Sequence, residues 1–371
     1  MRALEMMHDP RYMIHDKNLN FASCFFRSCI EHPVSCILII LIFFISGCAI
    51  NPVTLKKDFM VISEETEVNI GRKIDPSIIK ELGYYNDPTL QSYVNEVGQK
   101  LVSISARRNV RYYFKVLDTP IENAFALPGG YIYITRGLLA FLNSEAELAG
   151  VLGHEIGHVV GRDSANLISE SMAVQILSLG GMAAGPSGRE MIQAANLLFN
   201  SIMLGYGREK EFLADAQGVE YMFKAGYDPL QMTVFQARLS QKGQTPIGYQ
   251  QYNMTHPDIF DRMGRTAARA KVTIAMDKAK EDISDHQKET SRYPKDGILA
   301  DEYKTHLDGL AYGPKERLQR IQIYTAQEGD TVKSVAEKAL GDPKRWREIA
   351  ELNGIKLEDT LSSGEKLKII Y

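Results

Sequence analysis

The sequence predicts an α+β protein, in which a mainly helical domain with a small mixed β-sheet is followed by a small βααβ unit. Apolar residues recur at helical spacing in several stretches between residues 63 and 224. Two short stretches, 111–116 and 131–135, are instead rich in aromatic and β-branched residues, which favour strands. The chain has 371 residues, which leaves room for two folded units, because a single core usually stops growing near ~250 to 300 residues.

The N-terminal part predicts a secretory leader. It holds all four cysteines, so the body of the protein has no predicted disulfide framework: Cys24, Cys29, Cys36 and Cys48. The apolar run at residues 34–45 is shorter than the ~18 residues that a membrane span needs. It ends in Ile45-Ser46-Gly47-Cys48, which resembles the bacterial lipobox. We therefore expect a lipoprotein signal peptide at 1–47, lipidation of Cys48 and a tether at 48–62. An uncleaved signal anchor is the alternative.

The next segment predicts two helices and a small sheet. Apolar side chains at helical spacing indicate helices within residues 63–105, separated at Asp87-Pro88. Residues 111–116 (RYYFKV) and 131–135 (YIYIT) predict strands. Leu127-Pro128-Gly129-Gly130 predicts a turn directly before the second strand.

A capped helix is predicted at residues 145–160, because Ser144 and Glu147 match a capping box and Gly161 offers a stop. Further helices are expected where apolar residues again follow helical spacing: 167–179, 191–204, 208–224 and one that opens at Asp228-Pro229. Between the first two lies a glycine-rich stretch, 180–190, for which we expect a mobile loop.

The C-terminal third predicts a linker and a second unit. Residues 271–321 are dense in charge with little apolar pattern, which is typical of a helix end and a linker. Residues 322–371 regain order, with strand-like segments at each end (IYTA and KLKIIY) and helical segments at 332–339 and 345–352.

The helix at 145–160 contains a candidate metal site, His154-Glu155-Ile156-Gly157-His158. Residues four apart share a helix face, so His154 and His158 can direct imidazole nitrogens at one ion. Glu155 is rotated by about 100° from His154 and can reach a water on the metal rather than the metal itself. It would act as general base and then return the proton to the leaving amine. The alternative is a chance grouping of these residues on a partly buried helix.

Two carboxylates on the helix at 208–224 complete the candidate site. Glu211 and Asp215 lie one turn apart on the same face. A catalytic zinc takes three protein ligands and leaves one position for water, so Glu211 would be the third ligand of one Zn²⁺ per chain. Asp215 would hydrogen-bond a ligand histidine and fix its tautomer. Taken singly, each carboxylate would more simply be a solvated surface group.

Four motifs occur in a characteristic order: NAFALPGGYIYITRGLL (residues 123–139), HEIGH (154–158), EFLAD (211–215) and THPDIFDR (255–262). Over about residues 63–270 they resemble the peptidase family of the CaaX prenyl proteases, the HtpX heat-shock proteases and the periplasmic protease-chaperone BepA. The resemblance implies a minigluzincin fold, zinc ligation by His154, His158 and Glu211, and proteolysis of misfolded or stalled envelope proteins. The chain departs from HtpX in lacking membrane helices around the site, and from BepA in lacking a helical-repeat tail.

The resemblance also implies roles that spacing alone cannot give. Asn123, Ala124 and Phe125 resemble the active-site edge strand, to which a substrate peptide would add as an extra strand. His256 and Arg262 would stabilise the oxyanion, or His256 would cap the zinc in a latched state. The simpler alternative for His256 is a residue that precedes a helix start. The sequence leaves open whether His256 or the loop 180–190 covers the site at rest.

The C-terminal unit resembles a LysM module at three segments: 324–336, 340–354 and 363–369. The resemblance implies binding to the N-acetylglucosamine backbone of peptidoglycan. The alternative is a small packing domain without a ligand, in which Trp346, the only tryptophan, is part of the core.

Together these observations predict a lipid-anchored periplasmic zinc endopeptidase that acts in envelope protein quality control. Its substrates would be unfolded or misassembled envelope proteins. Ala49 after Cys48 lacks the aspartate used for inner-membrane retention, which favours an outer-membrane lipoprotein facing the periplasm. The net charge of -3 gives no reason to expect nucleic acid binding. The alternatives are a non-catalytic envelope chaperone or scaffold that binds peptidoglycan through its tail, and a peptidase of peptidoglycan stem peptides.

Overall fold

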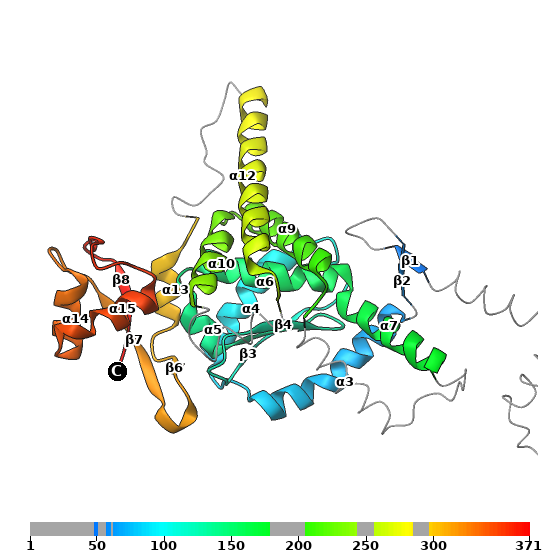
Figure 1. Cartoon of the computed structure of the whole chain (residues 1–371), viewed down its shortest axis with the longest axis horizontal. Helices are drawn as coiled ribbons and strands as arrows, with labels where there is room; N and C mark the ends of the chain where they lie inside the picture. Colours follow the sequence, from blue (N-terminus) through cyan, green and yellow to red (C-terminus); the bar gives the residue numbers. More distant parts are fainter. Residues whose placement is uncertain (1–47, 51–56, 61, 179–204, 243–255, 285–296) are drawn as a thin grey trace, which may run out of the picture.

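The computed structural model describes residues 48–371 except for 51–56, 61, 179–204, 243–255 and 285–296 (Figure 1). The predicted signal peptide, the loop 180–190 and the predicted helix 191–204 therefore lie outside the described residues. The first described elements are two short antiparallel strands, β1 (Cys48–Ile50) and β2 (Lys57–Phe59).

Two helices precede the central sheet, which confirms the prediction: α3 (Glu64–Leu82) and α4 (Pro88–Val102). Both begin at a capping side chain. Ser63 Oγ accepts the N–H of Thr66, and the Asp87 carboxylate accepts the N–H of Leu90. These local hydrogen bonds explain why the helix starts could be found in the sequence.

A three-stranded mixed sheet follows: β3 (Tyr113–Leu117), β4 (Ala124–Leu127) and β5 (Tyr131–Thr135). The strand order is β3-β5-β4, with β5 parallel to β3 and antiparallel to β4. The predicted strands at 111–116 and 131–135 are confirmed, the first shifted by one to two residues. Strand β4 forms one edge of the sheet.

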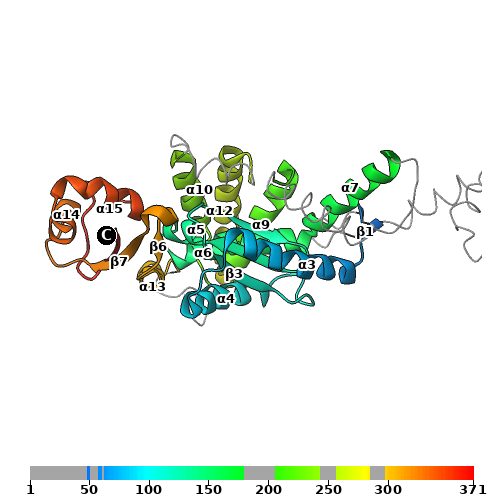
Figure 2. The same cartoon turned by 90° about the horizontal axis from the view of Figure 1, so that it is seen from below.

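The two faces of the sheet contact different helices. The side chains of Ala124 and Ala126 belong to the main apolar core, which also includes residues of α4 and α6 (Glu145–Gly161). The side chains of Phe125 and Leu127 join a second cluster with residues of α3. Figure 2 shows α3 and α4 next to β3. The sheet is therefore covered on both faces.

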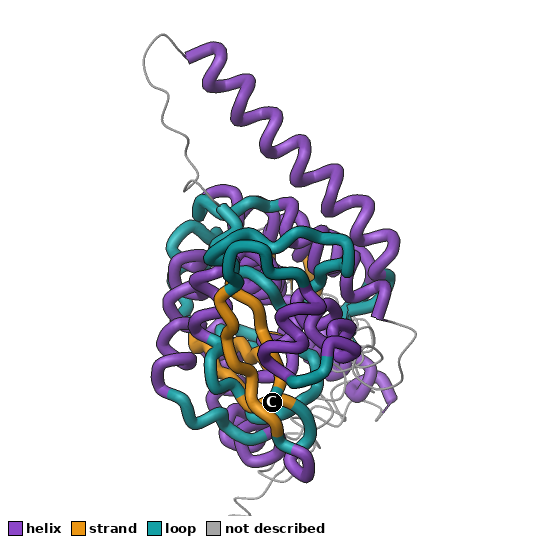
Figure 3. Tube along the Cα trace, turned by 90° about the vertical axis from the view of Figure 1, so that its left-hand side faces the viewer, coloured by secondary structure: helices purple, strands orange, loops and turns teal. Residues whose placement is uncertain are grey.

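Helix α6 is the centre of the main domain and confirms the helix predicted at 145–160. It packs against α4, β4 and two later helices, α9 (Arg208–Lys224) and α10 (Leu230–Lys242). The other helices that the structure describes in this domain are α5 (Arg136–Phe141), α7 (Asp163–Ser178) and α12 (Ile259–Ser284). Helix α12 packs on α9 and α10 and then projects from the body (Figures 1 and 3). No helix among the described residues is both long and apolar enough to cross a membrane.

The C-terminal unit, which in the structure begins at residue 300 and so includes part of the predicted linker 271–321, lies beside α5 at one end of the molecule (Figure 1). Its elements are α13 (Ala300–His306), β6 (Ala311–Tyr312), η3 (Lys315–Arg317), β7 (Gln319–Thr325), α14 (Val332–Leu340), η4 (Pro343–Arg345), α15 (Trp346–Asn353) and β8 (Lys366–Ile370). From β7 to β8 they follow the predicted order of strand, helix, helix and strand. Strands β6, β7 and β8 form an antiparallel sheet.

Candidate metal centre

Small residues allow the two helices that carry the predicted ligands to approach closely. A Cβ atom added to Gly157 of α6 would lie 2.9 Å from the Cα of Ala214 on α9, which real Cβ atoms essentially never do. A Cβ on Gly153 would lie 3.1 Å from the Cα of Gly218. Glycine at these two positions therefore sets the helix separation, and places Glu211 over the histidine face of α6.

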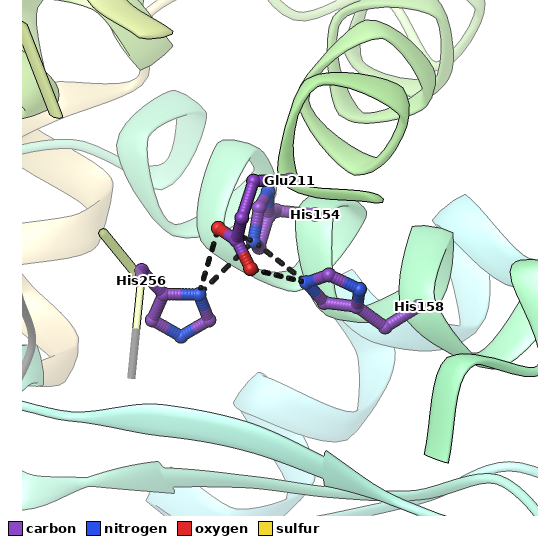
Figure 4. Close-up of side chains that lie close together, drawn as sticks. All are labelled: His154, His158, Glu211 and His256. Carbon is purple, nitrogen blue, oxygen red and sulfur yellow. Dashed lines mark hydrogen bonds and ion pairs between the residues drawn. The ribbon is translucent and has the colours of Figure 1, made fainter. Parts of the chain in front are cut away.

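The three predicted ligands converge in the buried interior (Figure 4). His154 Nε2 lies 3.1 Å from His158 Nε2. The Glu211 carboxylate lies 3.5 Å from His154 Nε2 and 3.3 Å from His158 Nε2. Ligands about 2.0 to 2.1 Å from a tetrahedral zinc are separated by about 3.3 to 3.4 Å, so these separations fit one such ion.

The hydrogen bonds of the other ring nitrogens show why a cation fits here. His154 Nδ1 lies 2.8 Å from Asp215 Oδ1, and His158 Nδ1 lies 2.8 Å from Asp163 Oδ2. A carboxylate accepts, so each Nδ1 carries the proton and each neutral ring presents the lone pair of Nε2. Two lone pairs facing each other at 3.1 Å repel unless a positive charge lies between them.

The pKa shifts show the same preference for positive charge. Burial disfavours a charged His158 ring, yet hydrogen bonds to Asp163 and Glu211 raise the pKa of His158 to about 10. Burial likewise disfavours charge on Glu211, but Arg262 and His256 hold the pKa of Glu211 well below its usual range. The pocket is therefore electron-rich, and it attracts either protons or a metal ion.

Glu155 lies beside this ligand set with a carboxylate that accepts no hydrogen bond from the described residues. Its side chain is buried, and neither carboxylate oxygen has a hydrogen-bond partner among the described residues. Beyond hydrogen-bond geometry, its Oε1 lies 3.4 Å from His256 Nε2. A buried carboxylate with free lone pairs is suited to take a proton from water.

His256 occupies the fourth corner of the cluster and faces the three predicted ligands (Figure 4). His256 Nδ1 lies 3.2 Å from His154 Nε2 and 3.2 Å from Glu211 Oε2. The four ligand atoms of His154, His158, Glu211 and His256 all lie within 4.8 Å of one another. In this conformation the ring lies directly against two of the three predicted ligands, and its capping role stays a prediction.

Arg262 reaches the site from the first turn of α12. Its Nε and Nη2 donate to the two oxygens of Asp215 at 2.8 and 2.7 Å, and its Nη1 lies 2.6 Å from Glu211 Oε2. The guanidinium therefore fixes the two carboxylates that support and complete the ligand set. The predicted oxyanion role of Arg262 stays a prediction, because in this conformation all three guanidinium nitrogens face carboxylates.

The backbone N–H and C=O groups of the three predicted peptide-binding residues point in two directions, toward β5 or away from it. Thr135 N donates to Asn123 O at 3.0 Å, so the backbone of Asn123 faces β5, and the alternation of an antiparallel pair turns Phe125 the same way. Ala124 faces outward from the sheet edge. Substrate binding at these three residues stays a prediction.

Two further residues at the site were not predicted. Asp163 supports His158 in the same way that Asp215 supports His154. The ring of Tyr206 packs on that of His158 with centroids 4.1 Å apart. Asp163 follows Arg162, which takes a left-handed conformation (φ 56°) and turns the chain back toward His158. Helical spacing gives no signal for such a reversal.

The site combines two histidines from α6, a carboxylate from α9 as the third predicted ligand, and the Glu155 carboxylate beside them. This arrangement is that of a metallopeptidase. Comparison with known proteins gives a family match for the region that holds this site. Residues 88–270 match the family model of peptidase family M48.

The chain is similar to several curated proteins of this class. It is 30% identical over 185 residues to the mitochondrial metalloendopeptidase OMA1 of Schizosaccharomyces pombe, covering 48% of this chain and 53% of that protein. It is 31% identical over 194 residues to a putative beta-barrel assembly-enhancing protease of Vibrio cholerae, covering 50% and 40%. A protease HtpX homolog of Pyrobaculum calidifontis is 30% identical over 168 residues, covering 40% and 46%. The matched region thus spans about half the length of these relatives.

Proposed function

We propose that this chain is a zinc-dependent endopeptidase that cleaves unfolded or misassembled proteins of the cell envelope. The proposal rests on the Nε2 atoms of His154 and His158, which lie 3.1 Å apart. Hydrogen bonds to Asp215 and Asp163 orient the two rings, and the Glu211 carboxylate faces both Nε2 atoms. This donor set fits zinc, the usual metal of such sites. The similarity to an assembly-enhancing protease and to HtpX supports protein substrates.

The residues of the chain divide the work of peptide hydrolysis. Zinc, when bound, would polarise the scissile carbonyl and lower the pKa of water. Glu155 takes the proton from the attacking water and passes it to the leaving amine. Ala124, at the sheet edge, holds the substrate backbone in an extended conformation. His256 has to leave its place against His154 before water and substrate can enter.

The location and the tail complete the proposal. The lipobox-like sequence before Cys48 supports a lipid-anchored protein of the outer membrane that faces the periplasm. The LysM-like segments of the C-terminal unit support binding to peptidoglycan. Both features would keep the peptidase near newly exported proteins.

Metal analysis together with an assay of cleavage tests the catalytic proposal. We expect the purified protein to hold one equivalent of zinc and to cleave casein. Glu155→Gln should keep the zinc and lose cleavage by at least about 100-fold, because the general base is gone while the ligands remain. His154→Ala should lose both zinc and cleavage.

Purified peptidoglycan assayed beside casein separates the proposal from its rivals. Release of stem peptides without cleavage of casein would replace the proposal by a peptidoglycan peptidase. A protein that holds no zinc, binds unfolded casein and leaves it intact would be the non-catalytic chaperone.

A further inference from the structure

The edge strand β4 offers two outward-facing carbonyl groups. In an antiparallel pair, hydrogen-bonded and non-hydrogen-bonded residues alternate. The Asn123–Thr135 pair is hydrogen-bonded, and the register pairs Ala124 with Ile134 and Ala126 with Ile132. Ala124 and Ala126 therefore direct their N–H and C=O groups away from β5, toward the side where another strand can add.

Side chains occupy both of these carbonyls. His256 Nε2 lies 3.2 Å from Ala124 O. Ser164 Oγ donates to Ala126 O at 3.2 Å, and the Tyr206 hydroxyl lies 2.7 Å from Ser164 Oγ and 3.4 Å from Ala126 O. Each hydroxyl has a single proton, and the shorter distances favour a chain in which Tyr206 donates to Ser164 and Ser164 donates to Ala126.

The two contacts are built alike. Each involves a buried side chain that also touches a predicted metal ligand: His256 touches His154, and Tyr206 packs on His158. The metal site and the sheet edge are therefore connected at two places. His256 connects His154 to Ala124, and Tyr206, through Ser164, connects His158 to Ala126.

We propose that Ser164 and Tyr206 compete with an incoming peptide for the second carbonyl of the sheet edge and so weaken its binding, an inference that rests on the proposed peptidase function. A peptide that adds to β4 must give one backbone N–H to Ala124 and another, two residues along, to Ala126. The Ser164 hydroxyl already donates to Ala126 O, so the peptide makes the second bond in competition with it. The site then takes extended, unstructured chains, and it excludes sequences in which proline removes either N–H.

Binding to an inactive protein tests this inference without relying on catalysis. In a Glu155→Gln/His256→Ala background, binding of a fluorescein-labelled, unstructured casein peptide is measured by anisotropy, with zinc content checked in each variant. Adding Ser164→Ala and Tyr206→Phe should tighten the Kd by about 2- to 10-fold, the range expected for one net hydrogen bond. Tyr206→Phe keeps the ring that packs on His158.

Tyr221→Phe is the matched control, because this buried hydroxyl donates to Gln217 away from the sheet edge. It should leave the Kd unchanged. An unchanged or weaker Kd in the Ser164→Ala/Tyr206→Phe protein would overturn the inference.

Peptides that each carry one N-methylated amide give a second, independent readout on the same background without the Ser164 and Tyr206 changes. Binding should weaken at two positions two residues apart and be nearly unaffected at the amide between them. Equal losses at all positions would contradict the inference. If wild type cleaves casein but this pattern is absent, only the present inference fails; if the pattern appears without cleavage, only the catalytic proposal fails.

Discussion

At the scale of single residues, the two predicted histidine ligands have the same kind of support. Asp215 and Asp163 each fix an Nδ1 proton and raise the basicity of the opposite nitrogen. Asp163→Asn keeps an acceptor but removes the charge. We expect zinc affinity to fall by about 10- to 100-fold, measured by competition with a chromophoric chelator.

Asp261→Asn, which changes an exposed carboxylate at the start of α12, is the control and should keep the wild-type affinity. If the Asp163→Asn protein also kept it, the Asp163 hydrogen bond would be a packing feature only.

Residue types at regular spacing were enough to predict which side chains converge at the candidate site, but not their surroundings. His154, Glu155 and His158 lie on one helix, and Glu211 and Asp215 on another, so helix periodicity placed each set correctly. Tyr206 and Asp163 reach the site from irregular backbone and a left-handed turn. Their positions depend on tertiary packing, for which the sequence has no periodic signal.

At the scale of elements, Glu67 of α3 connects the parts that surround α6. It accepts two hydrogen bonds from Arg107 at 2.9 Å each, one from Arg162 at 2.8 Å and one from Gly129 N at 3.3 Å. Burial alone would raise the pKa of Glu67, but the ion pairs with Arg107 and Arg162 outweigh it, and the pKa is lowered.

This lowered pKa fixes the sign of a pH effect. The ion pairs add stability above the ordinary pKa of 4.5, and this contribution is lost as pH falls through the lower folded-state pKa. Glu67→Gln should therefore reduce the free energy of unfolding by about 3 kcal/mol at pH 7, as for a broken buried ion pair. The difference from wild type should shrink below pH 4.

Urea denaturation at pH 7 and pH 3.5 measures both values. Glu65→Gln, on an exposed part of the same helix, should change neither by more than about 0.5 kcal/mol. A destabilisation by Glu67→Gln that is the same at both pH values would exclude the ion pairs as its cause.

Helices whose starts are marked by a capping side chain were predicted well. Strand β4, which depends on packing against other elements, had no such signal in its own sequence. Helices α3, α4 and α6 begin at Ser63, Asp87 and Ser144, whose side chains accept hydrogen bonds from their own first turns. Strand β4 (AFAL) has no strand-like alternation of polar and apolar residues because both its faces are buried. Only its resemblance to a known edge strand indicated it.

At the scale of the whole molecule, buried hydrogen bonds and apolar packing connect the C-terminal unit to the peptidase domain. The side chain of Lys368 is fully buried, and its ammonium donates to the carbonyls of Ala140 and Leu142 at 2.6 and 2.7 Å. The guanidinium of Arg136 donates to the carbonyls of Ala311 and Gly313. Ile321 of β7 belongs to the main core.

These contacts predict that the two units unfold together. Differential scanning calorimetry of the wild type should give a single transition. Lys368→Met should lower the Tm of that transition, with a loss of stability of about 2 to 4 kcal/mol, because two buried carbonyls lose their donor. Lys333→Met, at an exposed position of α14, should leave the Tm within about 1 °C of wild type, since surface substitutions rarely matter. Two separate transitions, with only the smaller one moved by Lys368→Met, would mean that the tail is a tethered module whose contacts with α5 add nothing to the stability of the peptidase domain.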